Sequence, residues 1–359
     1  MNVFELTRAL IDIESISENE EQVGRYLYSY LAPLAARYGG SIELIEVEPR
    51  RFNLFAQWGD RLAVTLSTHI DTVPPYIPSS EDETHIHGRG ACDTKGIIAS
   101  MIKAAEALLE AGQRKFGLLF VVGEERSSVG AYHAAAHPRG SRYIVNGEPT
   151  ENRLALGSKG ALRYRVSATG KMAHSAYPEL GDSAIHKLID VLAEIRRIEL
   201  PTDPKLGPST LNIGLISGGR APNVIADEAH AELMIRLVGD SASTKAALQR
   251  AVEGPAAPQR GVQEQVAPQR GVQEKAALNF ILEIPALHLG AIDGIPTTVV
   301  AYTTDIPAFQ GQWGEPFLIG PGTIHVAHTL EERVPKNELI DAIEIYQTMV
   351  KELCRRASK

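Results

Sequence analysis

Apolar strand-like runs alternate with helical apolar spacing along the first 160 residues. Phe116–Glu125 begins as a continuous apolar run and ends in two adjacent acids. Because a strand that is apolar on both faces suits the centre of a sheet covered by helices on each side, we expect a central strand here. Leu62–Thr68 and Tyr143–Pro149 are further short strands, and helical spacing predicts helices at Val3–Ile13 and Thr94–Leu109. This order predicts an α/β domain.

The pattern changes after residue 160. Ala161–Thr169 alternates between apolar and polar positions, as a half-exposed strand does. Two more strands and two amphipathic helices are predicted at Thr210–Ser217, Val224–Val238, Ser183–Ile198 and Ser241–Val252. Half-polar strands with helices are typical of an α+β domain on a small antiparallel sheet. We therefore predict a first domain formed by residues 1–160 and 275–359, with a second domain, residues 161–274, inserted into it.

A tandem decapeptide lies near the end of this insertion. Ala257–Val266 and Ala267–Ala276 share APQRGVQE at their first eight positions. Two copies are too few for a solenoid, so an in-frame duplication in a loop fits better, since a loop lengthens at little entropic cost. No chemistry is predicted for this segment.

The composition excludes several classes of function. The 359 residues are 44% hydrophobic and 22% charged, and 36 Lys and Arg against 44 Asp and Glu give a net charge of −8. Without a basic run, neither nucleic acid nor an anionic membrane is an expected partner. No apolar run approaches the ~20 residues that span a bilayer, and no signal peptide is expected. Cys92 and Cys354 lie far apart, which predicts reduced thiols in a cytoplasmic protein.

Polar side chains follow the predicted strands. Alternation puts His69 and Asp71 on one side of the chain, which fits a metal ligand with its orienting carboxylate, although a surface histidine beside a turn has the same pattern. Glu124 and Glu125 repel each other unless something cationic lies nearby, although a solvated turn also tolerates them.

Two further acids complete this set. Asp93 precedes a helix, so it is either an N-cap or a short carboxylate that could bridge two cations. Cys92, its neighbour, is interpreted as a small packed residue. Glu148 follows another short strand. Successive β-α units therefore bring four candidate ligands to one edge of a parallel sheet, namely His69, Asp93, Glu125 and Glu148.

Five motifs now carry a resemblance to a known family. THIDTVP, GRGACDTKG, GEE, GEP and a late GPG…AH occur in this order and cover nearly the whole chain. Together they resemble the acetylornithine deacetylase, succinyl-diaminopimelate desuccinylase and aminoacylase family of dinuclear zinc amidohydrolases. The resemblance implies an α/β fold of the zinc-exopeptidase type, with a mixed, mostly parallel sheet flanked by helices. It also implies an inserted α+β lid domain that makes a homodimer.

The resemblance also implies a metal site. Two Zn²⁺ ions, replaceable by Co²⁺ or Mn²⁺, would be held by His69, Asp93, Glu125, Glu148 and His328. Asp93 would bridge the two ions, because five ligands are too many for one tetrahedral zinc. Alternation does not separate His325 from His328, and the family's Ala-His dipeptide followed by acids selects His328.

The remaining roles come from the same resemblance. Glu124, the acid left without a metal, would take a proton from the attacking water and return it to the leaving amine. Asp71 would hold the ring of His69, and His174 would steady the oxyanion in the partner subunit's active site. His174 could also be an exposed loop residue, and Arg236 could pair with Glu232 instead of substrate. The residues expected to contact substrate are Asn223, Arg236, Gly322 and Thr304.

The predicted reaction is hydrolysis of the amide bond of a small N-acyl amino acid. The motif wording favours acetylornithine or acetylcitrulline, as in arginine biosynthesis. The alternative is a dipeptidase or carboxypeptidase with the same dizinc site. A non-catalytic binding protein would have lost a ligand or the base, and none is missing from this sequence.

Overall fold

The computed structural model describes residues 1–253 and 276–358. The tandem decapeptide, apart from Ala276, and the predicted boundary at 274–275 lie outside these residues. The chain divides into two compact units. The first unit contains Met1–Gly157, His288–Val300 and Thr304–Lys359, and the inserted unit contains Ser158–Leu287 and Ala301–Thr303.

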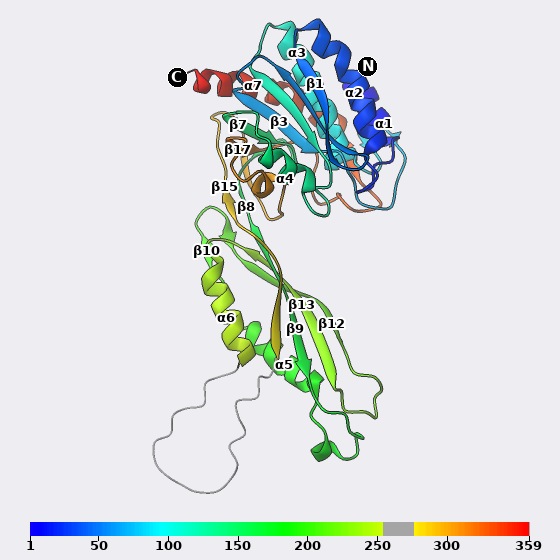
Figure 1. The fold of residues 1–359 in the computed structure, drawn as a ribbon, viewed down its shortest axis with the longest axis vertical. Coiled ribbons are helices and arrows are strands. Elements are labelled where there is room, and N and C mark those ends of the chain that lie inside the picture. The colour runs from blue at the N-terminus through cyan, green and yellow to red at the C-terminus, as the bar shows by residue number, and fades with distance from the viewer. Residues whose placement is uncertain (254–275, 359) are drawn as a thin grey trace. The chain divides into compact units, whose positions relative to one another are not determined.

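A six-stranded sheet organises the first unit (Figure 1). Its strands, in spatial order, are β1 (Ser41–Glu48), β2 (Arg51–Trp58), β6 (Phe116–Val121), β3 (Val64–His69), β7 (Tyr143–Asn146) and β17 (Glu315–Leu318). The pairs β6–β3, β3–β7 and β7–β17 are parallel, whereas β1–β2 and β2–β6 are antiparallel. This confirms the predicted mixed, mostly parallel sheet. Every residue of β6 and β3 is buried, as expected for strands covered on both faces.

Helices cover both faces of this sheet. One core joins its inward residues to α1 (Val3–Ile11), α2 (Glu21–Arg37), α3 (Gly96–Glu110) and α7 (Lys336–Ala357). The opposite face packs against α4 (Val129–Ala136) and a 3₁₀ helix, η3 (Ile306–Phe309). Two three-stranded sheets complete the description: β4 (Ser80–Glu81), β5 (His85–His87) and β18 (Arg333–Pro335), and β8 (Leu154–Ser158), β15 (Leu287–His288) and β16 (Thr297–Val300).

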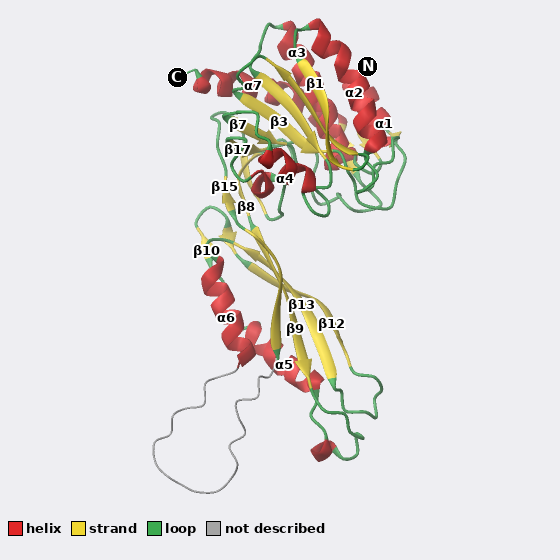
Figure 2. Ribbon diagram, in the orientation of Figure 1, coloured by secondary structure: helices red, strands yellow, loops and turns green. Residues whose placement is uncertain are grey.

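An antiparallel sheet forms the inserted unit (Figure 2). Its order is β12 (Thr210–Gly218), β13 (Glu228–Leu237), β9 (Gly160–Thr169) and β14 (Ala277–Ile284), and α5 (Ala184–Ile195) and α6 (Ser241–Glu253) pack on one face. Short elements are η2 (Pro178–Leu180), β10 (Thr202–Asp203) and β11 (Gly207–Pro208). Buried and partly buried residues alternate along β13, which confirms the predicted half-polar strand. Among the described residues, no helix has the length and apolar character that crossing a bilayer requires.

The start of α3 differs from the prediction. Residues Ala91–Lys95 form an irregular turn in which Asp93 and Thr94 have non-helical dihedral angles, and α3 begins only at Gly96. Asp93 is therefore not the N-cap of this helix, whose N-cap is Lys95. The turn leaves the carboxylate of Asp93 available for other contacts.

Candidate metal centre and active site

The candidate ligands come from the ends of adjacent strands. His69 is the last residue of β3, Glu124 and Glu125 follow β6, and Glu148 follows β7. Because β6, β3 and β7 are neighbouring parallel strands, their carboxyl ends meet at one edge of the sheet. The register that buries these strands thus also gathers the polar residues that follow them.

Two groups of side chains at this edge could hold metal ions. One contains His69, Asp93 and Glu148, and the other contains Asp93, Glu125 and His328. Within each group the candidate ligand atoms lie within 4.8 Å of one another. Asp93 belongs to both: its Oδ1 lies 3.0 Å from Nε2 of His69, and its Oδ2 lies 3.2 Å from Nε2 of His328. This is the arrangement that a bridging carboxylate requires.

His328 reaches the second group from a loop after β17. Its Nε2 lies 3.0 Å from Oε2 of Glu125, and its backbone has a φ of 63°. A non-glycine residue in this region is uncommon and is found at sites where a side chain is held in a particular direction. His325 is exposed and belongs to neither group. The structure therefore favours His328 over His325 as the ligand.

Negative charge is concentrated at this site. Burial raises the pKa of the Glu148 carboxyl well above its usual value, and nearby Asp93 raises it further. Burial also raises the pKa of Glu125, although the hydrogen bond from His328 acts in the opposite direction and lowers it. Hydrogen bonds to Asp93 and Glu125 raise the pKa of His328 to about 10. Acids enclosed together in this way favour a bound cation, and a mixed histidine and carboxylate donor set suits zinc.

Glu124 belongs to neither group of ligands. Burial raises the pKa of its carboxyl well above the usual value, and the negative charge of Glu148 adds to this effect. A carboxyl group beside a metal site but outside its ligand set can exchange protons with a reacting water. Glu124 thus lies beside the ligand groups and outside them, and its role as general base stays a prediction.

Asp71 holds the loop that carries these glutamates. Its Oδ1 accepts hydrogen bonds from the backbone N–H groups of Gly123 (2.9 Å) and Glu124 (3.1 Å), and its Oδ2 accepts one from that of Glu125 (3.3 Å). The Nδ1 of His69 lies 3.0 Å from the backbone carbonyl oxygen of Asp71 but 3.6 Å from Oδ1. The carbonyl is thus the hydrogen-bond acceptor for the ring, and the carboxylate acts on it through its charge.

Asp305 belongs to a turn that the resemblance places beside the substrate pocket, and no separate role was predicted for it. It is buried beside the cluster, and its Oδ1 has no hydrogen-bond partner among the described residues. Burial raises its pKa to about 7, and its charge raises the pKa of Glu124. The available signal is its position next to Thr304, a residue expected to contact substrate. That pattern alone does not separate a buried acid from a surface turn.

Thr304 and Gly322 are the two residues of the first unit that were predicted to contact substrate, and both make contacts within the protein. The Oγ1 of Thr304 accepts a hydrogen bond from the backbone N–H of Ile306 at the start of η3. Gly322 has a φ of 85°, and a Cβ there would lie 2.5 Å from Cβ of Cys92. Its N–H donates to Glu338. These contacts explain both residues by packing, and their contact with substrate stays a prediction.

The inserted unit brings two of its three candidate residues together. The backbone N–H of Ser175 donates to the carbonyl oxygen of Asn223, and His174 forms an isolated bridge with Val224. Nδ1 of His174 accepts a hydrogen bond from the N–H of Ala176, so a neutral ring carries its proton on Nε2. His174 and Asn223 are both exposed.

Arg236 lies elsewhere in this unit. It is near the carboxyl end of β13, whereas Asn223 precedes the start of that strand, so about 25 Å of extended chain separates them. Glu232 pairs with Arg163 and Arg165 rather than with Arg236. Within one chain the structure therefore does not bring Arg236 to His174 and Asn223.

Comparisons with known proteins agree with this architecture. Residues 156–259 match the peptidase dimerisation domain, and residues 53–152 match peptidase family M28. The chain is 36% identical to a peptidase M20 domain-containing protein of Schizosaccharomyces pombe, over 97% of this chain and 84% of the relative. It is 34% identical to a protein of Arthroderma otae named as a probable carboxypeptidase, over 98% of this chain and 86% of the relative.

A solved structure shares the fold over the whole length. Aminopeptidase PepT from Bacillus cereus superposes with a TM-score of 0.77 at 18% identity, covering 98% of both chains. At this identity the likeness shows the fold alone, whereas the S. pombe and A. otae proteins are similar enough in sequence to show the family. The chain therefore belongs to the M20 peptidase family of metal-dependent hydrolases.

Proposed function

We propose that this protein is a metal-dependent exopeptidase that removes a residue from the carboxyl end of short peptides. The observation that carries the proposal is the pair of ligand groups sharing Asp93, with Glu124 beside them and outside both. The relative from A. otae, named as a probable carboxypeptidase, covers nearly all of this chain and supports this choice of substrate. A dipeptidase would use the same site.

The deacetylase reaction placed first by motif wording gains no support from these relatives. Those motifs surround the metal ligands and the base, and a peptidase and an N-acyl-amino-acid deacetylase both hydrolyse an amide with such groups. The motifs therefore indicate the type of reaction. The substrate's side chain and acyl group are recognised by other residues of the pocket. The same reasoning removes the basis for a role in arginine biosynthesis.

The chain's own residues can perform the proton transfers of hydrolysis. His69, Asp93, Glu125, Glu148 and His328 would hold two zinc ions. Zinc bound there would lower the pKa of a water molecule and polarise the scissile carbonyl. Glu124 would accept a proton from the water as its oxygen attacks the carbonyl carbon, and would return this proton to the amine nitrogen as the C–N bond breaks. Asp71 keeps Glu124 in place through the backbone of Gly123 and Glu124.

The inserted unit would supply two further contacts. A homodimer through the peptidase dimerisation domain would let His174 of one subunit serve the other's active site. Its Nε2–H would then donate to the developing oxyanion. Arg236 would bind the free carboxylate that a carboxypeptidase or dipeptidase substrate presents. Burial lowers the pKa of this guanidinium, although it remains charged at neutral pH.

A substrate panel tests the proposal. Purified protein is assayed with Zn²⁺ or Co²⁺ on N-blocked dipeptides, free dipeptides, the same peptides with an amidated carboxyl end, acetylornithine and acetylcitrulline. We expect hydrolysis of peptides with a free carboxyl end, loss of activity after chelation and dialysis, and recovery on adding metal. Faster turnover of acetylornithine than of any peptide would contradict the carboxypeptidase assignment, and full activity without metal would contradict the mechanism.

A further inference from the structure

Glu332 is a buried carboxylate next to the candidate metal centre that the mechanism above does not use. It is 2% exposed, and its Oε2 lies 2.6 Å from Nη1 of Arg89, itself 1% exposed. A buried charge is tolerated only where it is paired and hydrogen-bonded. The hydrogen-bond partners of Glu332 therefore indicate its role.

The second oxygen of Glu332 binds the backbone of the loop that carries Asp93. Oε1 accepts hydrogen bonds from the N–H groups of Gly90 (3.0 Å), Cys92 (3.3 Å) and Asp93 (3.2 Å). In the turn formed by Ala91–Lys95, Asp93 and Thr94 have non-helical dihedral angles. A single carboxylate oxygen thus orders this turn, as Asp71 orders the loop of Glu124.

Glu332 also belongs to the segment that carries His328. It follows His328 by four residues, and its carbonyl oxygen accepts a hydrogen bond from Gly88. The next residues form β18, which pairs with β5. One side chain therefore connects the loop of Asp93 to the loop of His328, although these ligands are more than 200 positions apart in sequence.

We propose that Glu332 is a positioning residue for the second metal site, formed by Asp93, Glu125 and His328. It sets the distance between Asp93 and His328 and so controls how tightly this site binds its ion. The inference rests on the proposed metal-dependent function. His69 and Glu148, which complete the first site, are fixed by β3 and β7 rather than by the Glu332 segment. The first site therefore depends less on Glu332.

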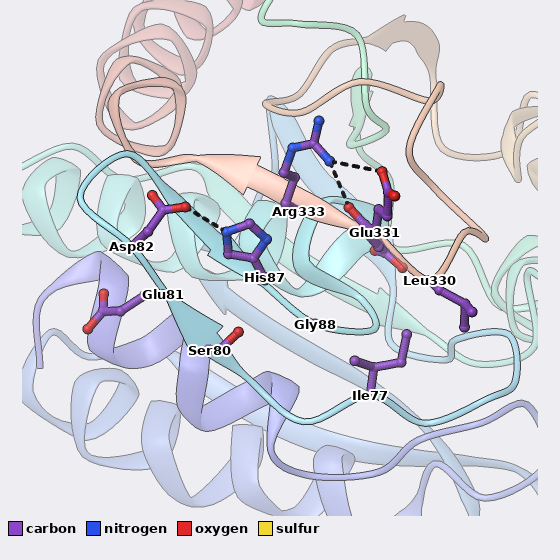
Figure 3. A pocket seen from close by; sticks show the side chains of 10 residues that line it. Ile77, Ser80, Glu81, Asp82, His87, Gly88, Leu330, Glu331 and Arg333 are labelled. Carbon is purple, nitrogen blue, oxygen red and sulfur yellow. Dashed lines mark hydrogen bonds and ion pairs between the residues drawn. The ribbon is translucent and has the colours of Figure 1, made fainter.

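The adjacent residue provides a matched control. Glu331 has an 85% exposed side chain, and its carboxylate lies 3.9 Å from Arg333. Figure 3 shows Glu331 and Arg333 facing each other at a surface pocket of about 610 Å³, which none of the five candidate ligands lines. Glu332 also lines this pocket, but its side chain is 1% exposed and binds Arg89 and the loop of Asp93, whereas that of Glu331 is exposed.

Two double variants separate positioning from simple stabilisation. Arg89→Met with Glu332→Gln removes the ion pair and keeps an oxygen that can accept from the loop. Arg89→Met with Glu332→Met removes the ion pair and that oxygen. Replacing both partners of a buried pair by well-packed apolar residues commonly preserves the fold. The two variants therefore differ in the contact to the backbone N–H groups.

Stepwise metal binding is the measurement. Full-length protein is stripped with a chelator and titrated with Zn²⁺ by calorimetry and with Co²⁺ by visible absorption. In the methionine double variant we expect the second ion to bind about 10- to 100-fold more weakly. The first ion, whose site shares Asp93 but keeps His69 and Glu148, should be weakened by about 3-fold or less. The glutamine double variant should stay within about 3-fold of wild type for both ions, as should Glu331→Gln.

Several outcomes would overturn the proposal. If the second ion binds equally tightly to the two double variants, Glu332 serves only as the ion-pair partner of Arg89. If both ions bind more weakly by the same factor, Glu332 stabilises the protein as a whole rather than the second site. If the methionine variant does not fold, Glu332→Asp shortens the side chain with its charge kept, and unchanged second-ion affinity there would also refute the role. Wild-type protein that binds a single ion would instead refute the dinuclear site itself.

Discussion

Glutamates of the candidate metal centre and a glutamate of the inserted sheet lie in contrasting environments. In the first unit, burial raises the pKa values of Glu124 and Glu148. In the inserted unit, hydrogen bonds from Arg163 and Arg165 lower the pKa of Glu232, and those two arginines are 43% and 48% exposed. Glu232 is therefore neutralised by water-exposed cations, whereas Glu124 and Glu148 lie buried beside other acids.

This difference follows from sheet architecture. The strands β3 and β6 are buried on both faces, so a polar side chain at their ends enters a dry environment where charge interactions are strong. In the described part of the inserted unit, helices pack on one face of the antiparallel sheet, and its polar positions face away from them. Charged residues there are screened by solvent and contribute little to stability. The following changes test the comparison, from the largest expected effect to the smallest.

Glu124→Gln should have the largest effect on catalysis. Glutamine keeps the shape of the side chain but accepts no proton, so we expect kcat to fall by about 10²- to 10⁴-fold. Metal content should stay the same, because Glu124 belongs to neither ligand group. Steady-state kinetics and metal analysis check this. Undiminished turnover would show that another group takes the proton.

Glu20→Gln should have the largest effect on stability. Its carboxylate makes two hydrogen bonds to Arg51, at 2.6 and 2.9 Å, and the two side chains are 0% and 9% exposed. After the change Arg51 still pairs with the half-exposed carboxylate of Glu48, so we expect the free energy of unfolding to fall by part of the about 3–5 kcal/mol that an uncompensated buried charge costs. Denaturant unfolding measures it. If Glu20→Gln lowered the free energy of unfolding no more than Glu232→Gln does, the buried and exposed ion pairs would not differ in their contribution to stability.

His174→Ala tests whether the inserted unit contributes to chemistry. If its Nε2–H donates to the oxyanion in a dimer, kcat should fall by about 10²-fold while KM changes little. His186, an exposed histidine of α5, provides the control, and His186→Ala should leave both constants unchanged. Mixing inactive Glu124→Gln with inactive His174→Ala should restore part of the activity if the two residues act across subunits. No restoration in mixed dimers would place His174 outside the partner's site.

Asp71→Asn tests whether a buried carboxylate positions the loop of Glu124. The amide has one acceptor oxygen instead of two and no charge, so we expect kcat or metal affinity to fall by about 10- to 100-fold. Asp82 also accepts hydrogen bonds from backbone N–H groups, those of Thr84 and His85, but in an exposed hairpin. Asp82→Asn should therefore leave kinetics and metal binding unchanged. Equal effects of the two variants would deny Asp71 a special role.

Glu232→Gln should have the smallest effect. The arginines that pair with this residue remain solvated after the change, so the midpoint of thermal unfolding at neutral pH should move little. Because the folded-state pKa of Glu232 is lowered, any stabilisation is present above its unfolded pKa and is lost as the pH falls through the folded pKa. Wild type and variant should therefore converge in acid. A large loss at neutral pH would contradict the comparison.

The sequence alone determined the architecture and the candidate ligands. Continuous apolar runs predicted the buried strands, and alternation predicted the half-exposed sheet of the inserted unit, because strand periodicity depends directly on which faces are buried. The residues that follow β3, β6 and β7 were predicted to meet, since neighbouring parallel strands end at one edge. The motif wording did not determine the substrate, because ligands and base are common to peptidases and deacetylases.

Only the tertiary structure decided how the ligands are held. That Asp71 binds three consecutive N–H groups, that Glu332 connects the loops of Asp93 and His328, and that Asp305 is buried are contacts between distant segments. No local pattern encodes them, since a carboxylate that accepts from a distant backbone has the same sequence signature as one in a solvated turn. The sequence determined which groups can bind metal, and the packing of the chain determined which acids remain to position them.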